Sequence, residues 1–150
     1  MFCKHGLTIV ALAAALGVST VVLADGPEDQ IKYRKNTMDS LGGHTGAAFA
    51  LVGGKVEHPE HLLPHAQALA AMGKLIKDLF PEGSGEGKTD AKPEIWQNPD
   101  DFSKKIETAE QATAAFLTAV ESGDQEKIGA AIKDVGQACK GCHDEYRVKH

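Results

Sequence analysis

The sequence predicts an all-α protein, an antiparallel four-helix bundle. Proline and glycine divide residues 27–150 into four blocks, and apolar side chains recur in each block every three or four residues. This spacing is typical of one face of an amphipathic helix. Outside the N-terminal apolar segment, no alternating run of β-branched residues indicates a strand. Four helices joined by short connections, except for one long loop, are expected to alternate in direction around a common core.

The first two helices are expected over residues 27–52, ended by a Gly-Gly pair, and over residues 58–80, ended by a proline. Pro64 falls in or near the first turn of the second helix, where a missing backbone N–H is tolerated. The core-facing stripe of the first helix consists of Ile31, Arg34, Met38, Leu41, Thr45, Ala48 and Val52.

A long loop is expected over residues 81–100, a segment rich in Gly, Pro and polar residues. The third helix follows to about residue 121 and the fourth covers residues 124–150, with Asp100 and Asp124 as N-caps. The helical faces are rich in Ala, and the chain has only five Phe, two Tyr and one Trp. Such a core is thin, and something large and apolar is expected to complete it.

Residues 1–24 have the features of a cleaved secretory signal peptide: Lys4 near the start, the uncharged run Leu7–Leu23, and small residues ending at Ala24. An uncleaved membrane anchor is the alternative, but the run is at the short limit for crossing a bilayer. We therefore expect residues 25–150 to form one exported, periplasmic domain that is free of the membrane. The net charge of −5 becomes one unit more negative without Lys4, which excludes a basic nucleic-acid-binding surface.

A Cys-x-x-Cys-His motif formed by Cys139, Cys142 and His143 lies near the end of the chain. This is the pattern for covalent attachment of c-type haem. The two thiols add across the two vinyl groups of the porphyrin, and the next residue donates its imidazole to the iron. Both cysteines lie on the apolar stripe of the fourth helix, so the haem would lie in the bundle core and supply its missing apolar volume. The sequence therefore predicts one haem c.

Other roles for the two cysteines fit the sequence less well. A disulfide across two intervening residues would close almost no loop and add little stability. A thioredoxin-like redox pair normally follows a strand in a βαβ unit, which the helical pattern does not provide. A zinc site needs four ligands, often from a second cysteine pair, and zinc would have to recruit distant histidines here.

Three histidines lie near the start of the second predicted helix. His58, His61 and His65 are spaced three and four residues apart, so they could share one face and bind a metal. No carboxylate or cysteine completes a convincing set, although Glu57 and Glu60 are near. We therefore interpret these histidines as part of a solvated surface.

A single Cys-x-x-Cys-His near the end of a four-helix chain resembles the class II cytochromes c, the cytochrome c′ family. Class I cytochromes c carry the motif near the N-terminus. The other matching segments are PEDQIKYRKNTM at 27–38, LFPEGSGEGKTDAKPEIW at 79–96 and GQACKGCHDEY at 136–146. The resemblance covers residues 25–150 and implies that the last helix carries the haem, with His143 as an iron ligand.

The resemblance also places Met38 at the second axial position of the iron, four residues after Arg34. In cytochromes c′ proper the distal side chain does not coordinate, and NO or CO can enter a five-coordinate iron. In the low-spin members a Met sulfur binds the iron, which gives a six-coordinate electron carrier. Met38 is compatible with both outcomes. Arg34 is expected to pair with a haem propionate, because a guanidinium pairs well with a carboxylate.

We therefore expect a periplasmic monohaem cytochrome that exchanges electrons with redox partner proteins by Fe(III)/Fe(II) cycling. Reversible binding of NO or another small gas is the alternative. No paired carboxylates or nucleophile constellation indicates an enzyme. Many members of the family form antiparallel dimers through their first two helices, so the resemblance makes a homodimer one further expectation.

Overall fold

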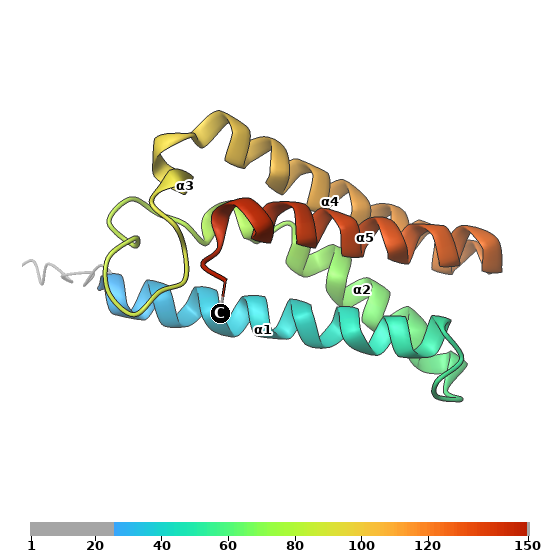
Figure 1. The fold of residues 1–150 in the computed structure, drawn as a ribbon. Coiled ribbons are helices and arrows are strands. Elements are labelled where there is room, and N and C mark those ends of the chain that lie inside the picture. The colour runs from blue at the N-terminus through green and yellow to red at the C-terminus, as the bar shows by residue number, and fades with distance from the viewer. Residues whose placement is uncertain (1–25, 150) are drawn as a thin grey trace, which may run out of the picture.

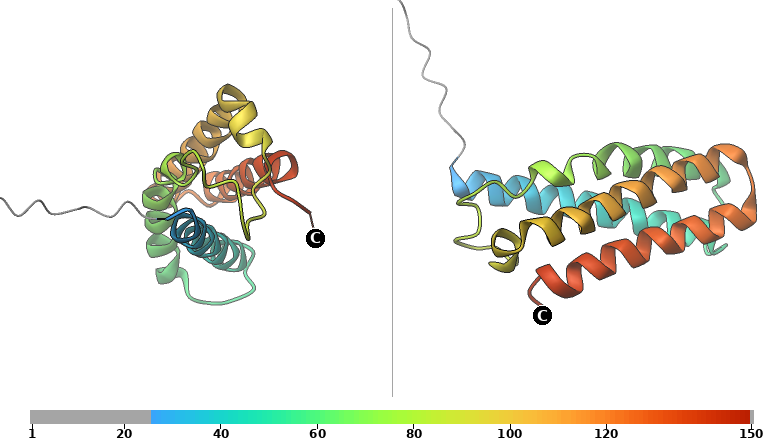
Figure 2. Two further views of the ribbon diagram at one scale, coloured as in Figure 1. Left: turned by 90° about the vertical axis from the view of Figure 1, so that its left-hand side faces the viewer. Right: turned by 90° about the horizontal axis from the view of Figure 1, so that it is seen from above.

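The structure is a computed structural model that describes residues 26–149. Its four main helices are α1 (Pro27–Val52), α2 (Leu62–Gly73), α4 (Pro99–Ser122) and α5 (Gln125–Tyr146). They alternate in direction and pack as an antiparallel bundle (Figures 1 and 2), as predicted. The predicted signal peptide, residues 1–24, lies outside the described residues. Within residues 26–149, no helix combines the length and the hydropathy needed to cross a bilayer.

The second helix is shorter than predicted. A 3-10 turn, η1 (Pro59–His61), precedes α2, and a second one, η2 (Ile76–Asp78), follows it. Gly73 ends α2 where this helix approaches α4 closely, because a Cβ at this position would lie 2.5 Å from the Thr113 Oγ1 atom. The apolar spacing does not reveal this end, since Ile76 still packs against the core after the helix has stopped.

The starts of α4 and α5 follow different rules. The expectation that Asp100 caps α4 is wrong, because the helix begins at Pro99 with Asn98 at the N-cap position. Proline lacks an N–H and fits the first helical position, so Asp100 falls inside the first turn. Asp124 caps α5 as predicted, accepting hydrogen bonds of 3.1 and 3.2 Å from two backbone N–H groups of the first turn.

The core consists of two clusters of apolar side chains. The larger cluster runs along the bundle and contains Leu41, Ala48, Ala66, Leu69, Phe116, Ala119, Ile128, Ile132 and Val135. The smaller cluster contains Ile95, Phe102, Ile106 and Tyr146 and lies near the C-terminal end of α5. Cys139 packs against the larger cluster and Cys142 against the smaller one. The two thiols therefore lie where the two clusters meet.

The long loop between η2 and α4 is irregular, as expected, except for the one-turn helix α3 (Glu94–Gln97). It passes the end of α5, where Ala91 and Arg147 form an antiparallel β-bridge. Backbone hydrogen bonds of 3.0 and 2.9 Å flank this bridge. The loop thus holds the C-terminal end of α5 in place.

A histidine pair connects α1 to the first turn of α2. The Nδ1 atoms of His44 and His65 lie 2.8 Å apart, so one ring must donate a proton that the other accepts. Burial, and secondly the nearby charge of His44, lowers the pKa of His65 below its usual value. The fold therefore favours a pair that is not fully protonated.

We expect this pair to make the free energy of unfolding fall in mildly acidic solution. Because the pKa of His65 is lower in the folded chain, the unfolded chain takes up a proton first as the pH falls through about 6.5. The stabilising contribution is complete above that pH and is lost progressively below it. Urea unfolding at about pH 7.5 and about pH 5.5 should show a smaller loss in His65→Gln than in the wild type. An equal loss in both proteins would contradict this explanation, and exposed His58→Gln is the matched control.

Candidate haem-binding site

A pocket of about 360 Å³ lies between α1 and the C-terminal end of α5. Both helices contribute charged and apolar groups, and the long loop covers one side. The lining residues are Arg34, Lys35, Met38, Asp39 and Gly42 from α1; Cys142, His143 and Tyr146 from α5; Phe102 from α4; and Ile76, Phe80, Thr89, Asp90, Ala91, Ile95 and Arg147 from elsewhere.

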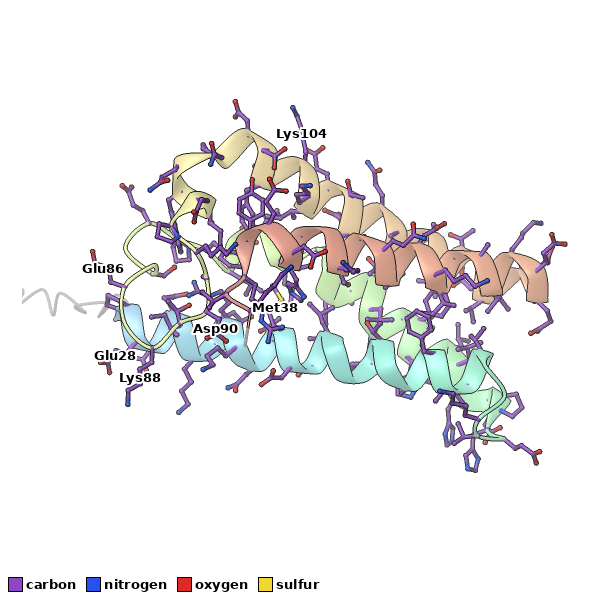
Figure 3. The ribbon with its side chains drawn as sticks, in the orientation of Figure 1. Glu28, Met38, Glu86, Lys88, Asp90 and Lys104 are labelled. Atoms are coloured by element: carbon purple, nitrogen blue, oxygen red, sulfur yellow. The ribbon has the colours of Figure 1, made fainter. Side chains whose placement is uncertain are left out.

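The structure brings most of the predicted haem-binding residues to this pocket. Met38 and Arg34 come from α1, and Cys142 and His143 come from the last turns of α5. Cys139 lies one turn earlier on α5 and is half-buried against the larger core cluster. In Figure 3 the Met38 side chain lies in the space between α1 and α5.

Burial controls the protonation of the motif. It raises the pKa of the Cys139 thiol, and it raises that of Cys142 to about 11, with the neighbouring Cys139 as the next cause. Burial also lowers the pKa of His143, and the positive charge of Arg147 adds to this effect. The imidazole is therefore neutral at neutral pH, which is the form that donates a nitrogen lone pair to a metal.

This donor set fits a c-type haem. Cys139 and Cys142 are three residues apart on α5, so both thiols reach the same side of the helix. The neutral imidazole of His143 follows directly. The pocket beside them carries the apolar side chains of Phe80 and Phe102, which suit a porphyrin face. The thiol pair, the nitrogen ligand and the apolar walls therefore agree with the chemistry that the motif predicts.

Arg34 has a set of partners that the sequence did not reveal. Its side chain is buried, and its Nη1 group donates to the Leu79 carbonyl at 3.2 Å and to Ser84 Oγ at 2.8 Å. Its Nη2 group donates to the Ser84 carbonyl and to Thr89 Oγ1, both at 2.8 Å. The guanidinium also lies 4.9 Å from the centre of the Phe80 ring. These contacts engage the four terminal N–H groups within the protein itself, and the pairing with a haem propionate stays a prediction. Arg34 therefore anchors the loop to α1.

An aromatic group at the pocket was missed by the sequence analysis. The Phe102 ring makes edge-to-face contacts with Phe80 at 4.9 Å and with Tyr146 at 5.0 Å between centroids. The Tyr146 hydroxyl donates to Asp101 Oδ2 at 2.6 Å. Trp96 Nε1 donates to the Phe80 carbonyl at 3.2 Å. The sequence does hold a signal for this group, because three of its few aromatic residues, Phe80, Trp96 and Phe102, lie between positions 80 and 102.

The chain matches a family model and curated relatives over most of its length. The family model described as Cytochrome C' matches residues 29–147. Cytochrome c' of Pararhodospirillum photometricum is 34% identical over 122 residues, which are 81% of this chain and 98% of the relative. Cytochrome c' of Rhodospirillum rubrum is 32% identical over 142 residues, 94% of this chain and 97% of the relative.

Solved structures give the same result. Cytochrome c prime from Shewanella frigidimarina superimposes with a TM-score of 0.80 at 32% identity, covering 85% of this chain and 100% of that one. A nitric oxide complex of a mutant cytochrome c prime from Alcaligenes xylosoxidans gives 0.78 at 31% identity, with the same coverage. Proteins of this family carry a covalently attached c-type haem, and Cys139 and Cys142 are the thiols that fit it. This chain therefore belongs to the cytochrome c′ family and is a four-helix-bundle protein with one haem c.

Proposed function

We propose that this cytochrome reversibly binds a small gas such as NO or CO on the Met38 side of its haem. The observation that carries the proposal is the shared pocket: α1 supplies Met38, and α5 supplies His143. Relatives with bound NO and with bound carbon monoxide are among the similar solved structures, which supports gas binding as the function. This proposal replaces electron transfer as the leading interpretation.

Four residues of the pocket would have separate roles in gas binding. When bound, the haem supplies an iron that can accept a diatomic ligand and change its oxidation state. His143 would hold the iron through its neutral imidazole. Met38 would lie beside the position of the gas, where its unbranched, flexible thioether could turn aside without a displacement of α1. Phe80 and Phe102 keep the pocket apolar and limit the entry of water.

Electron transfer is the second candidate, and Met38 is the observation that favours it. A thioether sulfur can coordinate haem iron and raises its reduction potential. In that case the six-coordinate iron would exchange electrons with redox partner proteins. Lys35 and Arg147, which line the pocket, would then border the docking surface. Neither candidate requires a catalytic side chain, so we propose a binding or carrier protein and not an enzyme.

Replacing Met38 with alanine separates the two candidates. If gas binding is the function, the reduced wild type should be high-spin and shift with CO, and Met38→Ala should bind CO about tenfold faster or more because a steric barrier is gone. The measurement is the visible spectrum of both oxidation states with and without CO, followed by CO association kinetics.

Met38→Leu is the matched control, since it keeps the bulk and removes the sulfur. It should behave like the wild type if Met38 only fills space. A wild type that is low-spin, ignores CO and becomes high-spin in both variants would establish ligation by Met38. This result would overturn gas binding and support electron transfer as the function.

Export and self-association are proposals of the same kind. We propose periplasmic localisation from the apolar N-terminal segment, residues 1–24. One similar solved cytochrome c' is described as having a ligand-controlled dimer dissociation, which supports a homodimer here. N-terminal sequencing of the exported protein should begin at Asp25. Light scattering with and without CO should report the oligomeric state.

A further inference from the structure

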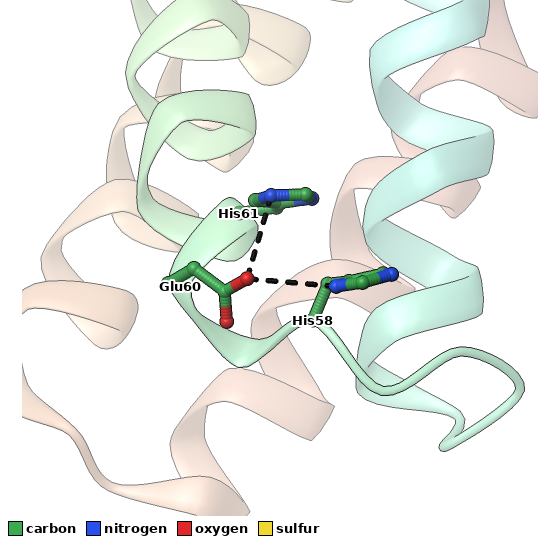
Figure 4. A group of neighbouring side chains, drawn as sticks. All are labelled: His58, Glu60 and His61. Carbon is green, nitrogen blue, oxygen red and sulfur yellow. Dashed lines mark ion pairs between the residues drawn. The ribbon is translucent and has the colours of Figure 1, made fainter.

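The turn between α1 and α2 brings three metal-binding side chains together. His58, Glu60 and His61 surround the start of η1, and the ligand atoms that they offer all lie within 4.8 Å of one another (Figure 4). This turn lies at the end of the bundle away from the C-terminal end of α5 (Figure 1), which lines the haem pocket. The cluster is therefore separate from the haem motif, and no part of the proposed function uses it.

The distances suit a shared cation. Glu60 Oε1 lies 3.5 Å from His58 Nδ1 and 3.4 Å from His61 Nε2. These separations exceed the 2.7–3.2 Å typical of N–H···O hydrogen bonds. Two ligands that are each about 2.0–2.1 Å from a tetrahedral zinc ion lie about 3.3 Å apart. The two observed separations are thus close to the edges of a tetrahedral coordination shell.

We propose that His58, Glu60 and His61 form a surface binding site for a borderline divalent cation, Zn²⁺ or Cu²⁺, with water completing the coordination. Two imidazoles and one carboxylate are a known ligand set for zinc, and imidazole favours zinc and copper over magnesium and calcium. Pro59 lies between the first two ligands and restricts the backbone there. Part of the ordering cost of binding is therefore already met in the free protein.

The charges and mobility of the three side chains agree with this site. A glutamate is ionised at neutral pH, so Glu60 offers a carboxylate between the two histidines. The side chains of His58, Glu60 and His61 are 61%, 65% and 57% exposed. The rings of His58 and His61 lie stacked with centroids 4.8 Å apart. Because both rings are exposed, rotation can bring the two nitrogens closer without disturbing the core.

The structure corrects the grouping that the sequence spacing suggested. His65 is not part of this cluster, because its Nδ1 lies 2.8 Å from Nδ1 of His44 on α1. The carboxylate that completes the set is Glu60, which the sequence placed near the histidines and which the 3-10 turn places between His58 and His61. Glu57 is an exposed glutamate of the same turn and is not in the cluster. It therefore offers a matched control.

Calorimetric titration of the haem-loaded protein with Zn²⁺ tests the proposal directly. We expect one ion per chain in the wild type and no binding of Mg²⁺ or Ca²⁺. His58→Gln, Glu60→Gln and His61→Gln should each weaken zinc binding about tenfold or more, since even the loss of an outer-shell partner costs about 10–100-fold. Glu57→Gln and His65→Gln should bind zinc like the wild type. Because all three ligands are exposed, circular dichroism should confirm that each variant remains folded.

Electron paramagnetic resonance with Cu²⁺ gives an independent readout. The wild type should show hyperfine coupling to two imidazole nitrogens, and either histidine variant should show coupling to one. The proposal is overturned if zinc does not bind, if Glu60→Gln binds as tightly as the wild type, or if His65→Gln removes the binding. The last result would assign the ion to the His44–His65 pair.

Discussion

A variant in which Cys139 and Cys142 are both replaced by alanine is expected to lose its covalent haem and several kcal/mol of stability. The thiols lie where the two core clusters meet, so a haem attached to them would complete the packing between the clusters. An enclosed cavity of about 360 Å³ would cost about 9 kcal/mol at about 24 cal/mol per Å³. The pocket is open to solvent, so we expect a smaller loss, of about 3–5 kcal/mol. This loss is a large part of the free energy of unfolding of a whole domain, which is typically about 5–15 kcal/mol.

The measurements are haem staining after denaturing electrophoresis and the free energy of unfolding in urea. Cys139→Ala and Cys142→Ala are the matched single variants, and each keeps one thiol that can form a thioether. Both should still carry haem through denaturing electrophoresis, and the double variant should not. Haem that stays attached in the double variant would show that another side chain holds it, and the assignment of the motif would fail.

Arg34→Leu is expected to destabilise the protein by about 3–5 kcal/mol and to release the loop between η2 and α4. The buried guanidinium donates four hydrogen bonds to acceptors of this loop. A hydrogen bond to a charged group contributes about 1.5–3 kcal/mol, and a buried acceptor left without its donor costs about 1–3 kcal/mol. Water that enters beside the leucine would recover part of the loss. Urea unfolding and limited proteolysis of the loop measure the two effects.

Lys32→Leu, at an exposed position of α1, is the control for the loss of a charge. It should change the free energy of unfolding by less than about 0.5 kcal/mol and leave the rate of loop proteolysis unchanged. Arg34→Lys should recover only part of the loss, because an ammonium group cannot reproduce the planar fork of donors. A variant that keeps its stability but shows a shifted reduction potential would support the predicted propionate contact instead of the anchor.

The parts of the fold that follow from local spacing could be predicted from the sequence. The stripe from Ile31 to Val52 defines α1, and the stripe that contains Cys139 and Cys142 defines α5. The haem motif needs no tertiary information, because its chemistry depends on five consecutive residues. The family assignment follows from the position of this motif in a four-helix chain, and the comparisons confirm it.

The parts that depend on tertiary contacts could not be predicted. α2 ends at Gly73, where it lies close to α4, although the hydrophobic period continues to Ile76. Arg34 was correctly placed on the buried stripe, but its acceptors lie 45–55 residues away in a segment without periodicity. Likewise, helical spacing grouped His61 with His65, whereas a 3-10 turn placed His61 beside Glu60.

The loop that joins η2 to α4 has a consequence for how the protein responds to a ligand. Arg34 ties the loop to α1, and the bridge between Ala91 and Arg147 ties the same loop to the end of α5. The loop thus connects α1 to α5, the two helices that would hold the opposite faces of the haem. This connection does not depend on the iron. The distance between the two helices is therefore fixed, since they cannot separate unless several hydrogen bonds break together. If the protein binds a gas as proposed, side-chain rotation within a fixed span would make room for the ligand, without displacement of the two helices.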